Sequence, residues 1–296
     1  AYAISNQATV APLLLQMQDA SIRDTIMGLT GFANRYYASA PGIAASDWLK
    51  ARWTALAAGR DHIAIAQYAH MRYDQRSVIA TIEGSDKAFD VIVLGAHLDS
   101  INIMGTRDTT RAPGADDDAS GVAGLTEILR VMAASGYKPR RTIKLIAYAA
   151  EEVGLRGSQE IAREYKKNGT NVVGVIQLDM TNFKGSDNDI YLFTDFTDEP
   201  QNLFLAKLVK TYLPTLTVGY DKCGYACSDH ASWHAQGYPT SMPFESEIRK
   251  DNPKIHTAND TLANSGNQAL HALKFARLAA AYAVELGSEA NRAGKR

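Results

Sequence analysis

The sequence predicts an α/β protein, a single globular domain over residues 1–296 with a mostly parallel central sheet and helices on both faces. Short apolar runs alternate with helical patterns along the chain, an order typical of β-α-β units and a parallel sheet. Asp90–Gly95 is a short apolar run, as expected of a central strand covered on both faces. No repeat, low-complexity segment or linker divides the 296 residues, although this length would also allow two ordinary domains.

The N-terminal third is predicted to contain helices followed by two strands. Ala8–Ser39 has helical periodicity and Pro41–Gly42 interrupts it. Ser46–Asp47 can cap a second helix over Trp48–Ala58. The strands expected before the central strand are Ile63–Ala69 and Val78–Ile82, with a turn at Glu83–Asp86.

Helices and strands are expected to alternate after the central strand. Ile101–Ala115 has no apolar periodicity and is expected to be a loop. The predicted helices are Gly121–Ala134, Ser158–Lys167, Pro200–Tyr212, Ser228–Gln236 and a long amphipathic helix over Leu262–Leu286. The predicted strands are Thr142–Tyr148, Asn171–Leu178, Ile190–Thr194, Leu216–Tyr220 and Thr240–Phe244. The tail Gly287–Arg296 is polar and expected to fray.

Composition and charge narrow the classes of function. Hydrophobic residues make up 46% and charged residues 21% of the chain, which is typical of a soluble globular protein. The net charge is −1, from 31 basic and 32 acidic residues, so we expect neither nucleic acid nor a membrane as a partner. No apolar run approaches the length of a membrane span. The chain starts at Ala1 without an initiator Met or a signal peptide, so we expect a mature or trimmed chain.

The only cysteines are Cys223 and Cys227, in the segment CGYAC. Two cysteines four residues apart suit a metal pair, a redox pair or a local disulfide. Because no other thiol is available to complete a zinc site, we favour the disulfide, and with it an oxidising, secreted setting. A loop this short gains little entropic stabilisation, so the bond would serve to shape the loop.

The stretch Thr142–Ser158 runs from a buried strand directly into two adjacent acids, Glu151 and Glu152. Adjacent carboxylates at the end of a buried strand repel each other and lose hydration, so they need a compensating positive charge. A bound divalent metal ion commonly supplies that charge. The alternative is a solvated strand end or a helix N-terminus, where acids suit the helix dipole.

Other potential metal ligands also follow predicted strands or lie in loops. Ligands bind outside the carboxyl ends of the strands in open α/β sheets. The residues expected at that edge are His97, Asp117, Glu151, Glu152 and Asp179, with His256 in a loop before the last helix. Each has an ordinary structural explanation by itself, but together the two histidines and three of the four carboxylates suit a pair of zinc ions with one bridging carboxylate. The residues alone therefore predict a metal hydrolase.

Seven motifs, spread over nearly the whole chain, are similar to those of a known protein family. They are GAHLDS, PGADDDASG, YAAEEVGLRGS, QLDMTN, CGYACSDHASWH, MPFES and IHTANDTL, in this order. Together they closely resemble the bacterial secreted leucyl aminopeptidases, which are co-catalytic dizinc metallopeptidases with the zinc-exopeptidase fold. The resemblance is weakest before Asp90 and in the C-terminal tail. It implies a secreted enzyme, with its signal and any pro-segment removed, that cleaves apolar, leucine-like residues from the N-termini of peptides.

The resemblance also implies a role for each residue of the site, with two Zn²⁺ per chain. His97 and Asp179 would bind one zinc, Glu152 and His256 the other, and Asp117 would bridge them. Glu151 would be the general base. Asp99 would hydrogen-bond the far nitrogen of His97, and the Asp117–Asp118 peptide would be cis.

For the side chain of the substrate, the resemblance points to an apolar pocket beside the metals. Its residues would be Met180, Phe193, Cys223, Tyr225, Cys227, Met242, Phe244 and Ile248, and the alternative is ordinary core packing. Tyr225 would also donate to the oxyanion, and Ser228 would support His256 or its loop. Phe193 stands where the family usually has a smaller aliphatic residue, and Ile248 and Asp251 replace aromatic residues, so the pocket is expected to be narrower or more polar.

Two further patterns suggest metal or triad chemistry without completing it. His230 and His234 have the i, i+4 spacing of a zinc pair, but the Glu of a zincin motif is absent between them. We therefore expect surface or packing roles for both. Ser228, Asp229 and His230 are successive residues, which is poor geometry for a serine triad.

Two alternatives to the aminopeptidase interpretation remain at this point. The first is a glutaminyl-cyclase-like enzyme, which would keep one zinc and run an acyl transfer without water. The second is a binding domain on a peptidase scaffold that has lost its activity, and such domains typically lose ligands or the base. We expect a monomer, and the choice of aminopeptidase over carboxypeptidase depends on the resemblance alone.

Overall fold

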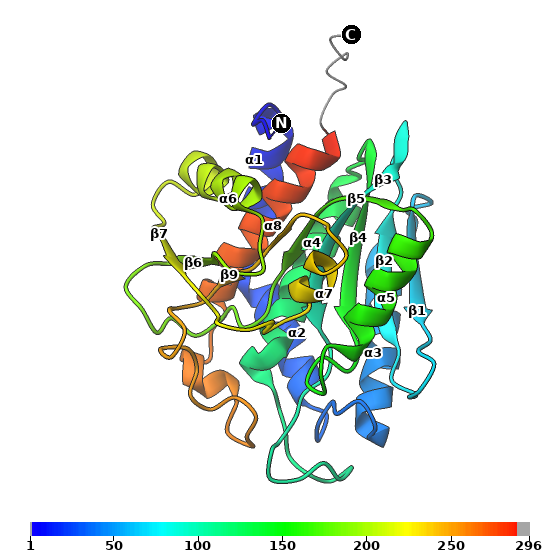
Figure 1. Ribbon diagram of the computed structural model, residues 1–296, viewed down its shortest axis with the longest axis vertical. Helices are drawn as coiled ribbons and strands as arrows, with labels where there is room; N and C mark the ends of the chain where they lie inside the picture. The colour runs from blue at the N-terminus through cyan, green and yellow to red at the C-terminus, as the bar shows by residue number, and fades with distance from the viewer. Residues whose placement is uncertain (1, 289–296) are drawn as a thin grey trace.

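The computed structural model describes residues 2–288, and Figure 1 shows a central sheet between helices. In spatial order its six strands are β1 (Ile63–Tyr68), β2 (Ser77–Ile82), β4 (Arg141–Tyr148), β3 (Lys87–His97), β5 (Asn171–Gln177) and β8 (Thr240–Ser241). Strand β3 pairs in parallel with β4 and β5, and β5 pairs in parallel with β8, whereas β1–β2 and β2–β4 are antiparallel. The α/β class and the mostly parallel sheet are confirmed.

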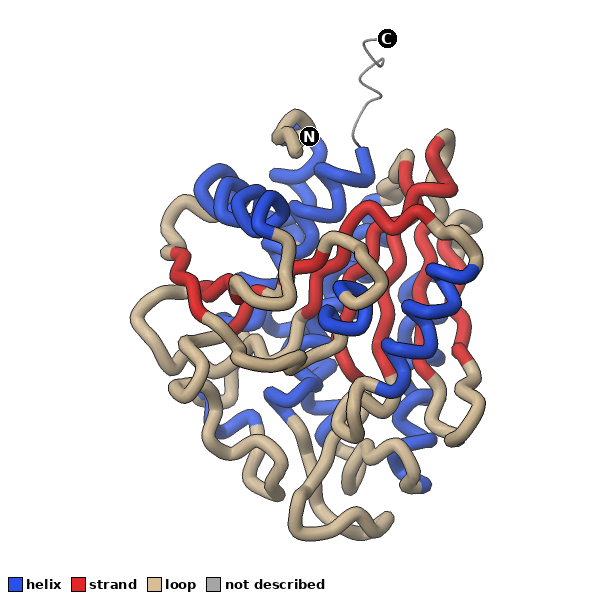
Figure 2. The backbone as a smooth tube through the Cα atoms, in the orientation of Figure 1, coloured by secondary structure: helices blue, strands red, loops and turns tan. Residues whose placement is uncertain are grey.

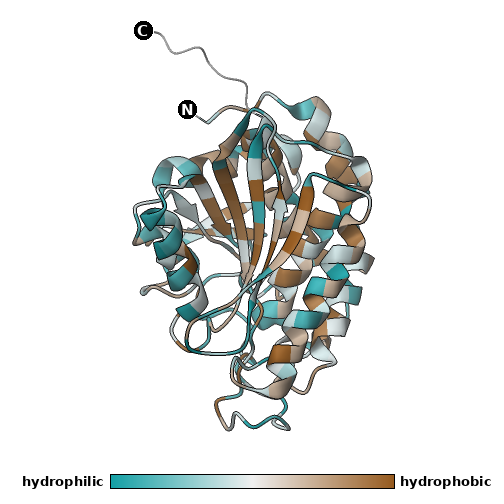
Figure 3. Cartoon of the chain, turned by 90° about the vertical axis from the view of Figure 1, so that its right-hand side faces the viewer, coloured by the Kyte–Doolittle hydropathy of each residue, from teal (hydrophilic) through white to brown (hydrophobic). Residues whose placement is uncertain are grey.

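The centre of the sheet is buried on both faces. Ile92 and Leu94 of β3 belong to the main core, whereas Val91 and Val93 pack in a second core on the opposite face. Figure 3 shows the apolar central strands between the helical layers. An unbroken apolar run is the pattern of a strand without a solvated face, so the sequence pattern explains the position of β3.

Helices cover both faces of the sheet (Figure 2). Helices α1 (Gln7–Gln16), α2 (Asp19–Thr30), α3 (Ala40–Ala57), α4 (Gly121–Ser135) and α8 (Leu270–Ser288) contribute to the main core, and α6 (Glu199–Tyr212) packs against α8. Helices α5 (Arg156–Lys167) and α7 (His230–His234) cover the other face. A second sheet of three strands has the order β7 (Val218–Asp221), β6 (Ile190–Phe193) and β9 (Pro243–Phe244).

The expected strand Thr240–Phe244 is wrong as one strand, because it divides between the two sheets. Ser241 pairs with Ile176 of β5, whereas Pro243 pairs with Leu192 of β6. The segment therefore joins the central sheet to the small sheet and does not extend either of them.

The predicted start of the third helix is also wrong. Helix α3 begins at Ala40, with Pro41 in its first turn, where the missing N–H of proline costs no hydrogen bond. Ser39 is the cap, and its side-chain oxygen accepts from the N–H of Gly42 at 2.9 Å. Ser46 lies inside the helix and donates to the carbonyl of Arg76 at 2.7 Å.

Two predicted helices near the C-terminal end differ from the structure. The single helix expected over Leu262–Leu286 is instead a short helical turn over Leu262–Ser265 followed by α8. The two are separated by a break at Gly266, which has a φ of 70°. The helix expected over Ser228–Gln236 is shorter in the structure, where α7 spans only His230–His234. Of the expected frayed tail, Gly287 and Ser288 belong to α8, and residues 289–296 lie outside the described residues.

Candidate metal centre and substrate cavity

The sheet brings three ligand-bearing segments to one edge. Strand β3 ends at His97, which pairs with Tyr148 at the end of β4, and Gln177 at the end of β5 pairs with Gly95. Parallel strands place their carboxyl ends at a common edge. The segment with Glu151 and Glu152 follows β4 and Asp179 follows β5, so these acids lie around His97.

Asp117 lies between the two histidines of the site. It lies at a non-helical kink within the segment Ala115–Ser120, and His256 lies in the loop before the last helix. Oδ1 of Asp117 is 2.9 Å from Nε2 of His97, and its Oδ2 is 3.0 Å from Nε2 of His256. One carboxylate therefore faces both imidazoles.

Among residues 2–288, three groups of side chains could hold a metal ion; one is His97, Glu151 and Glu152, and the other two share Asp117. Of the two groups that share Asp117, the first is His97, Asp117 and Asp179 and the second is Asp117, Glu152 and His256, each with ligand atoms within 4.8 Å of one another. In the second group, Oε2 of Glu152 is 2.9 Å from Nε2 of His256. Within the described part of the chain, residues 2–288, the buried atoms Oε1 of Glu152 and Oδ1 of Asp179 have no hydrogen-bond partner. Imidazole and carboxylate donors with unpartnered oxygens fit zinc.

The electrostatics of the site indicate that it needs added positive charge. Burial, with the charge of Asp117, raises the pKa of Glu152 to about 8. Burial also raises the pKa of the Glu151 carboxyl well above its usual value. Hydrogen bonds with Asp117 and Glu152 raise the pKa of His256 to about 11. A divalent cation removes this conflict, because its charge stabilises the ionised carboxylates and the neutral imidazoles.

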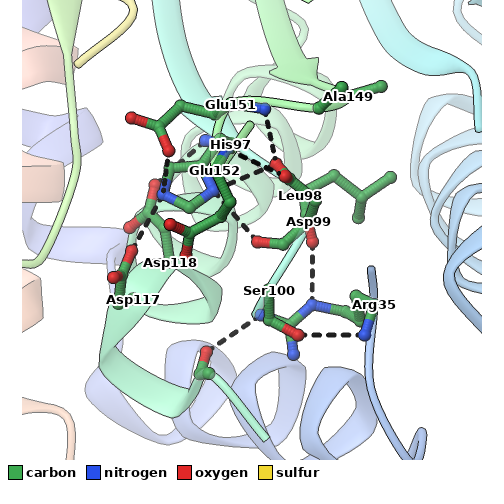
Figure 4. A network of polar contacts seen from close by, with 12 residues as sticks. Arg35, His97, Leu98, Asp99, Ser100, Asp117, Asp118, Ala149, Glu151 and Glu152 are labelled. Atoms are coloured by element: carbon green, nitrogen blue, oxygen red, sulfur yellow. Dashed lines mark hydrogen bonds and ion pairs between the residues drawn. The ribbon is translucent and has the colours of Figure 1, made fainter. Parts of the chain in front are cut away.

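Asp99 holds two parts of the site together, as Figure 4 shows. Its carboxylate accepts from the backbone N–H groups of Glu151 and Glu152, each at 3.0 Å. Nδ1 of His97 donates to the carbonyl oxygen of Asp99 at 3.0 Å, and Oδ1 of Asp99 lies 3.3 Å away. This contact fixes the imidazole with Nε2 facing the acids.

Asp118 fixes the backbone around the site, a role that the sequence did not suggest. The peptide bond between Asp117 and Asp118 is cis. The carboxylate of Asp118 accepts from the N–H groups of His97 at 3.0 Å and Met180 at 3.1 Å. It therefore joins the ends of β3 and β5 directly, within a motif in which only Asp117 was expected to act.

Arg35 is a second residue that the sequence analysis missed. Its fully buried guanidinium donates to the carbonyls of Leu98 at 2.8 Å, Gly114 at 2.9 Å and Pro113 at 2.5 Å. Leu98 directly follows His97 in the chain, and Pro113 and Gly114 come shortly before Asp117. Burial lowers the pKa of Arg35 to about 10, so the group stays charged at neutral pH. Contacts to backbone carbonyls leave no pattern in the spacing of side chains, which explains why the sequence gave no signal.

Ser228 contacts a different ligand from the one expected. Its hydroxyl donates to Oδ2 of Asp179 at 2.5 Å and accepts from Nε2 of Gln177 at 3.1 Å. The expectation that it supports His256 is therefore corrected. It orients Asp179, because β5 and α7 lie side by side.

A cavity of about 260 Å³ opens beside the acids. Its lining includes Glu151, Glu152 and Asp179 together with Leu155, Met180, Tyr225, Cys227 and Ile255. Met180, Phe193, Met242 and Phe244 form a buried apolar cluster behind it, against which Cys223, Cys227, Ile248 and Ile255 pack. Phe193 is fully buried with its ring centroid 4.9 Å from that of Phe244, so it fills the floor and does not line the cavity.

The remaining sequence predictions near the cavity concern the cysteines and the paired histidines. Cys223 and Cys227 form a disulfide, as predicted. His230 is fully buried and His234 is exposed. Within residues 2–288, neither belongs to a group of side chains placed to hold a metal, in agreement with the packing and surface roles expected of them.

Comparisons with known proteins agree with this geometry. The model of "Peptidase family M28" matches residues 77–281. "Leucine aminopeptidase 1" of Coccidioides posadasii is 35% identical over 297 residues, covering 96% of this chain and 75% of that protein. The crystal structure of the LapA aminopeptidase of Legionella pneumophila superposes with a TM-score of 0.90 at 34% identity, covering 98% of this chain and 76% of that one.

The fold is also shared with a different class of enzyme. The glutaminyl cyclase of Porphyromonas gingivalis superposes with a TM-score of 0.72 at 20% identity, covering 91% of this chain and 99% of that one. An identity this low shows the common fold alone. The choice between the two chemistries therefore depends on the residues of the site.

Proposed function

We propose, from the premise that this chain belongs to peptidase family M28 and is a metallo-aminopeptidase, that it uses two zinc ions to release apolar, leucine-like residues from the N-termini of peptides. The observation that carries the proposal is the pair of ligand groups sharing Asp117 beside Glu151 and an apolar cavity. A glutaminyl-cyclase-like site would need only one metal, whereas both ligand groups are complete here.

The zinc ions would be held by the residues of the two groups. His97 and Asp179 would bind one ion, Glu152 and His256 the other, and Asp117 both. Bound zinc supplies positive charge that polarises the scissile carbonyl and lowers the pKa of water. Asp99 and Ser228 orient these ligands through the hydrogen bonds to His97 and Asp179.

Glu151 would move the proton of the reaction. Its carboxylate lines the cavity, and its Oε2 is 3.6 Å from Nε2 of His97. The Asp99 carboxylate fixes the backbone of Glu151, so the side chain has a defined position. It would accept a proton from the attacking water and deliver it to the nitrogen of the leaving amine, as a general base and then a general acid.

The cavity would orient the N-terminal residue of the substrate. Its apolar wall, formed by Met180, Cys227 and Ile255, suits an aliphatic side chain. Tyr225 is 64% exposed at the rim, where its hydroxyl is free to donate to the oxygen that becomes negatively charged.

The setting of the enzyme is also proposed. We infer a monomeric, single-domain protein that acts outside the cell, where an oxidising environment maintains the Cys223–Cys227 disulfide. Among residues 2–288, no helix is long and apolar enough to cross a membrane.

The proposal is tested by following products of Leu-Ala-Gly-Phe and of its N-acetylated form by mass spectrometry. We expect stepwise release of leucine from the free peptide, no cleavage of the blocked peptide, and loss of activity with a zinc chelator. Release of phenylalanine first would indicate a carboxypeptidase. Cyclisation of a glutaminyl peptide without hydrolysis of the leucyl peptide would support the cyclase instead.

A further inference from the structure

A second cavity, of about 540 Å³, lies between helix α5 and the loop that joins β1 to β2. The loop contributes Met71, Arg72 and Tyr73, and the N-terminal part of α5 contributes Arg156, Gln159, Glu160 and Arg163. We call this cavity the arginine groove. The four residues of α5 follow the spacing that places side chains on one face of a helix, so the groove runs along α5.

The arginine groove and the substrate cavity are lined by consecutive residues of the same segment. Leu155 lines the substrate cavity, and the next residue, Arg156, lines the groove. The segment that leads to Glu151 is also held against the chain just after the loop wall of the groove, because the N–H groups of Ala149 and Ala150 donate to Ser77 and Gln75 at 2.9 and 3.3 Å. The apolar wall for the N-terminal residue, with Cys227 and Ile255, comes from other segments of the cavity lining.

The groove carries an excess of positive charge. It contains three exposed arginines and one carboxylate, Glu160. Glu160 accepts from Nδ1 of His70 at 2.8 Å and from the N–H of Met71 at 3.3 Å. Within residues 2–288, no carboxylate forms an ion pair with Arg72, Arg156 or Arg163.

One of the arginines is held in a fixed orientation. Nη1 of Arg156 donates to the hydroxyl of Tyr37 at 3.1 Å, and the guanidinium lies 5.2 Å from the centroid of the Tyr37 ring. A guanidinium oriented in this way loses less side-chain entropy when it binds a carboxylate. Arg163 stands seven residues further along α5, about 10 Å away, which matches about three residues of extended peptide.

We propose that the arginine groove binds the downstream part of the peptide substrate and favours acidic residues from the third position onward. The proposal rests on the aminopeptidase function proposed above, because the N-terminal residue must occupy the substrate cavity for the rest of the peptide to enter the groove. Charge complementarity and continuity with the catalytic cavity support a peptide as the occupant.

The test compares two peptides that differ only in charge, Leu-Ala-Asp-Glu-Asp-Ala-amide and Leu-Ala-Asn-Gln-Asn-Ala-amide. We expect the acidic peptide to have a kcat/KM about fivefold higher at low salt, as a few exposed ion pairs would produce, and the preference to shrink in 1 M salt. In the double variant Arg72→Gln/Arg163→Gln the preference should fall below twofold. Equal values for the two peptides with the wild type would overturn the proposal.

A matched control removes the same charge elsewhere. Lys207 and Lys210 are exposed on α6, away from the groove, so Lys207→Gln/Lys210→Gln should keep the fivefold preference. Loss of the preference in both double variants, or in neither, would also overturn the proposal. Melting temperatures would show that both variants are folded.

A binding measurement separates failure of the groove from failure of the proposed function. Fluorescence anisotropy with dye-labelled, N-acetylated Asp-Glu-Asp-Glu and its Asn-Gln-Asn-Gln counterpart requires no turnover. Charge-selective binding that disappears in Arg72→Gln/Arg163→Gln, without hydrolysis of leucyl-7-amido-4-methylcoumarin, would retain the groove and reject the aminopeptidase. Hydrolysis of that amide without charge-selective peptide binding would retain the aminopeptidase and reject the groove.

Discussion

Individual residues act here mainly through the groups that orient them. The backbone carbonyl of Asp99 accepts from His97 and its carboxylate accepts from the backbone of both glutamates, so one residue sets the positions of three functional side chains. Asp118 and Arg35 do the same for the backbone on either side of His97. Such contacts give a metal site its precision, because ligands that are free to move lose affinity and reactivity.

Glu151 should be required for turnover and dispensable for metal binding. We expect Glu151→Gln to bind the same amount of zinc and to lower kcat on a leucyl amide by about 10³-fold, since general acid–base catalysis contributes about 10²–10⁴-fold. Glu199→Gln, at the start of α6, is the control and should behave as the wild type. Zinc analysis and steady-state kinetics are the measurements, and a near-normal kcat for Glu151→Gln would exclude it as the base.

Phe193 should limit the size of the N-terminal side chain. Phe193→Ile removes a buried ring from the floor behind the cavity, so the ratio of kcat/KM for phenylalanyl over leucyl amides should rise about tenfold. Phe89→Ile changes a side chain that is 92% exposed at the opposite edge of the sheet and should leave the ratio unchanged. An unchanged ranking of substrates in Phe193→Ile would contradict this role.

At this scale the sequence predicted the side chains of the site and one supporting residue, Asp99, but not the other supports. His97, Asp117, Glu152, Asp179 and His256 were each expected near the others, and the structure brings them together. Their roles as zinc ligands stay predictions. Arg35 and the partner of Ser228 were not predictable, because both depend on which loops approach each other in space.

At the scale of elements, buried groups on α8 link the small sheet to the core. His271 donates through Nε2 to the carbonyl of Glu245 at 2.9 Å and accepts at Nδ1 from Lys274 at 3.1 Å. Both ring nitrogens are therefore used by the neutral imidazole. Burial lowers the pKa of His271 to about 4, and the charges of Lys274 and Lys184 act in the same direction against that of Asp189.

This neutral histidine predicts a pH dependence of stability. Between pH 4 and 6.5 the unfolded chain binds more protons at His271 than the folded chain, so the free energy of unfolding decreases as the pH falls through this window. The contribution is on the order of 3 kcal/mol. His271→Gln keeps a donor and an acceptor without titrating, so its denaturant midpoint should fall less between pH 7 and pH 4.5 than that of the wild type.

The control for this comparison is His234→Gln, at an exposed side chain on α7. Its denaturant midpoint should follow the wild type across the same range. A wild type and a His271→Gln variant with parallel curves would show that His271 does not titrate between the folded and unfolded states.

The elements themselves were largely predictable, and the exceptions have physical causes. Apolar periodicity located β3, β4, β5, α4 and α5, because each buries a continuous face. The same signal does not show where a chain changes sheets, as it does between Ser241 and Pro243. It also misplaced the start of α3, since a proline in the first turn resembles a helix break.

At the scale of the whole molecule, the site depends on the order of the strands. The sheet places β3 between β4 and β5, so His97 lies between the glutamates that follow β4 and the aspartate that follows β5. Sequence patterns predict the type of an element but not its neighbours in the sheet. The arrangement of the candidate metal centre therefore followed only from the structure and from motifs typical of the family.

The zinc content of the purified chain tests the central claim most directly. Inductively coupled plasma mass spectrometry of the wild type, after gel filtration in metal-free buffer, should give two zinc ions per chain. Asp117→Ala removes the carboxylate that faces both imidazoles and should lower this number. A wild type that binds no zinc even after zinc is added, or an Asp117→Ala variant that still holds two tightly, would contradict the shared two-metal site.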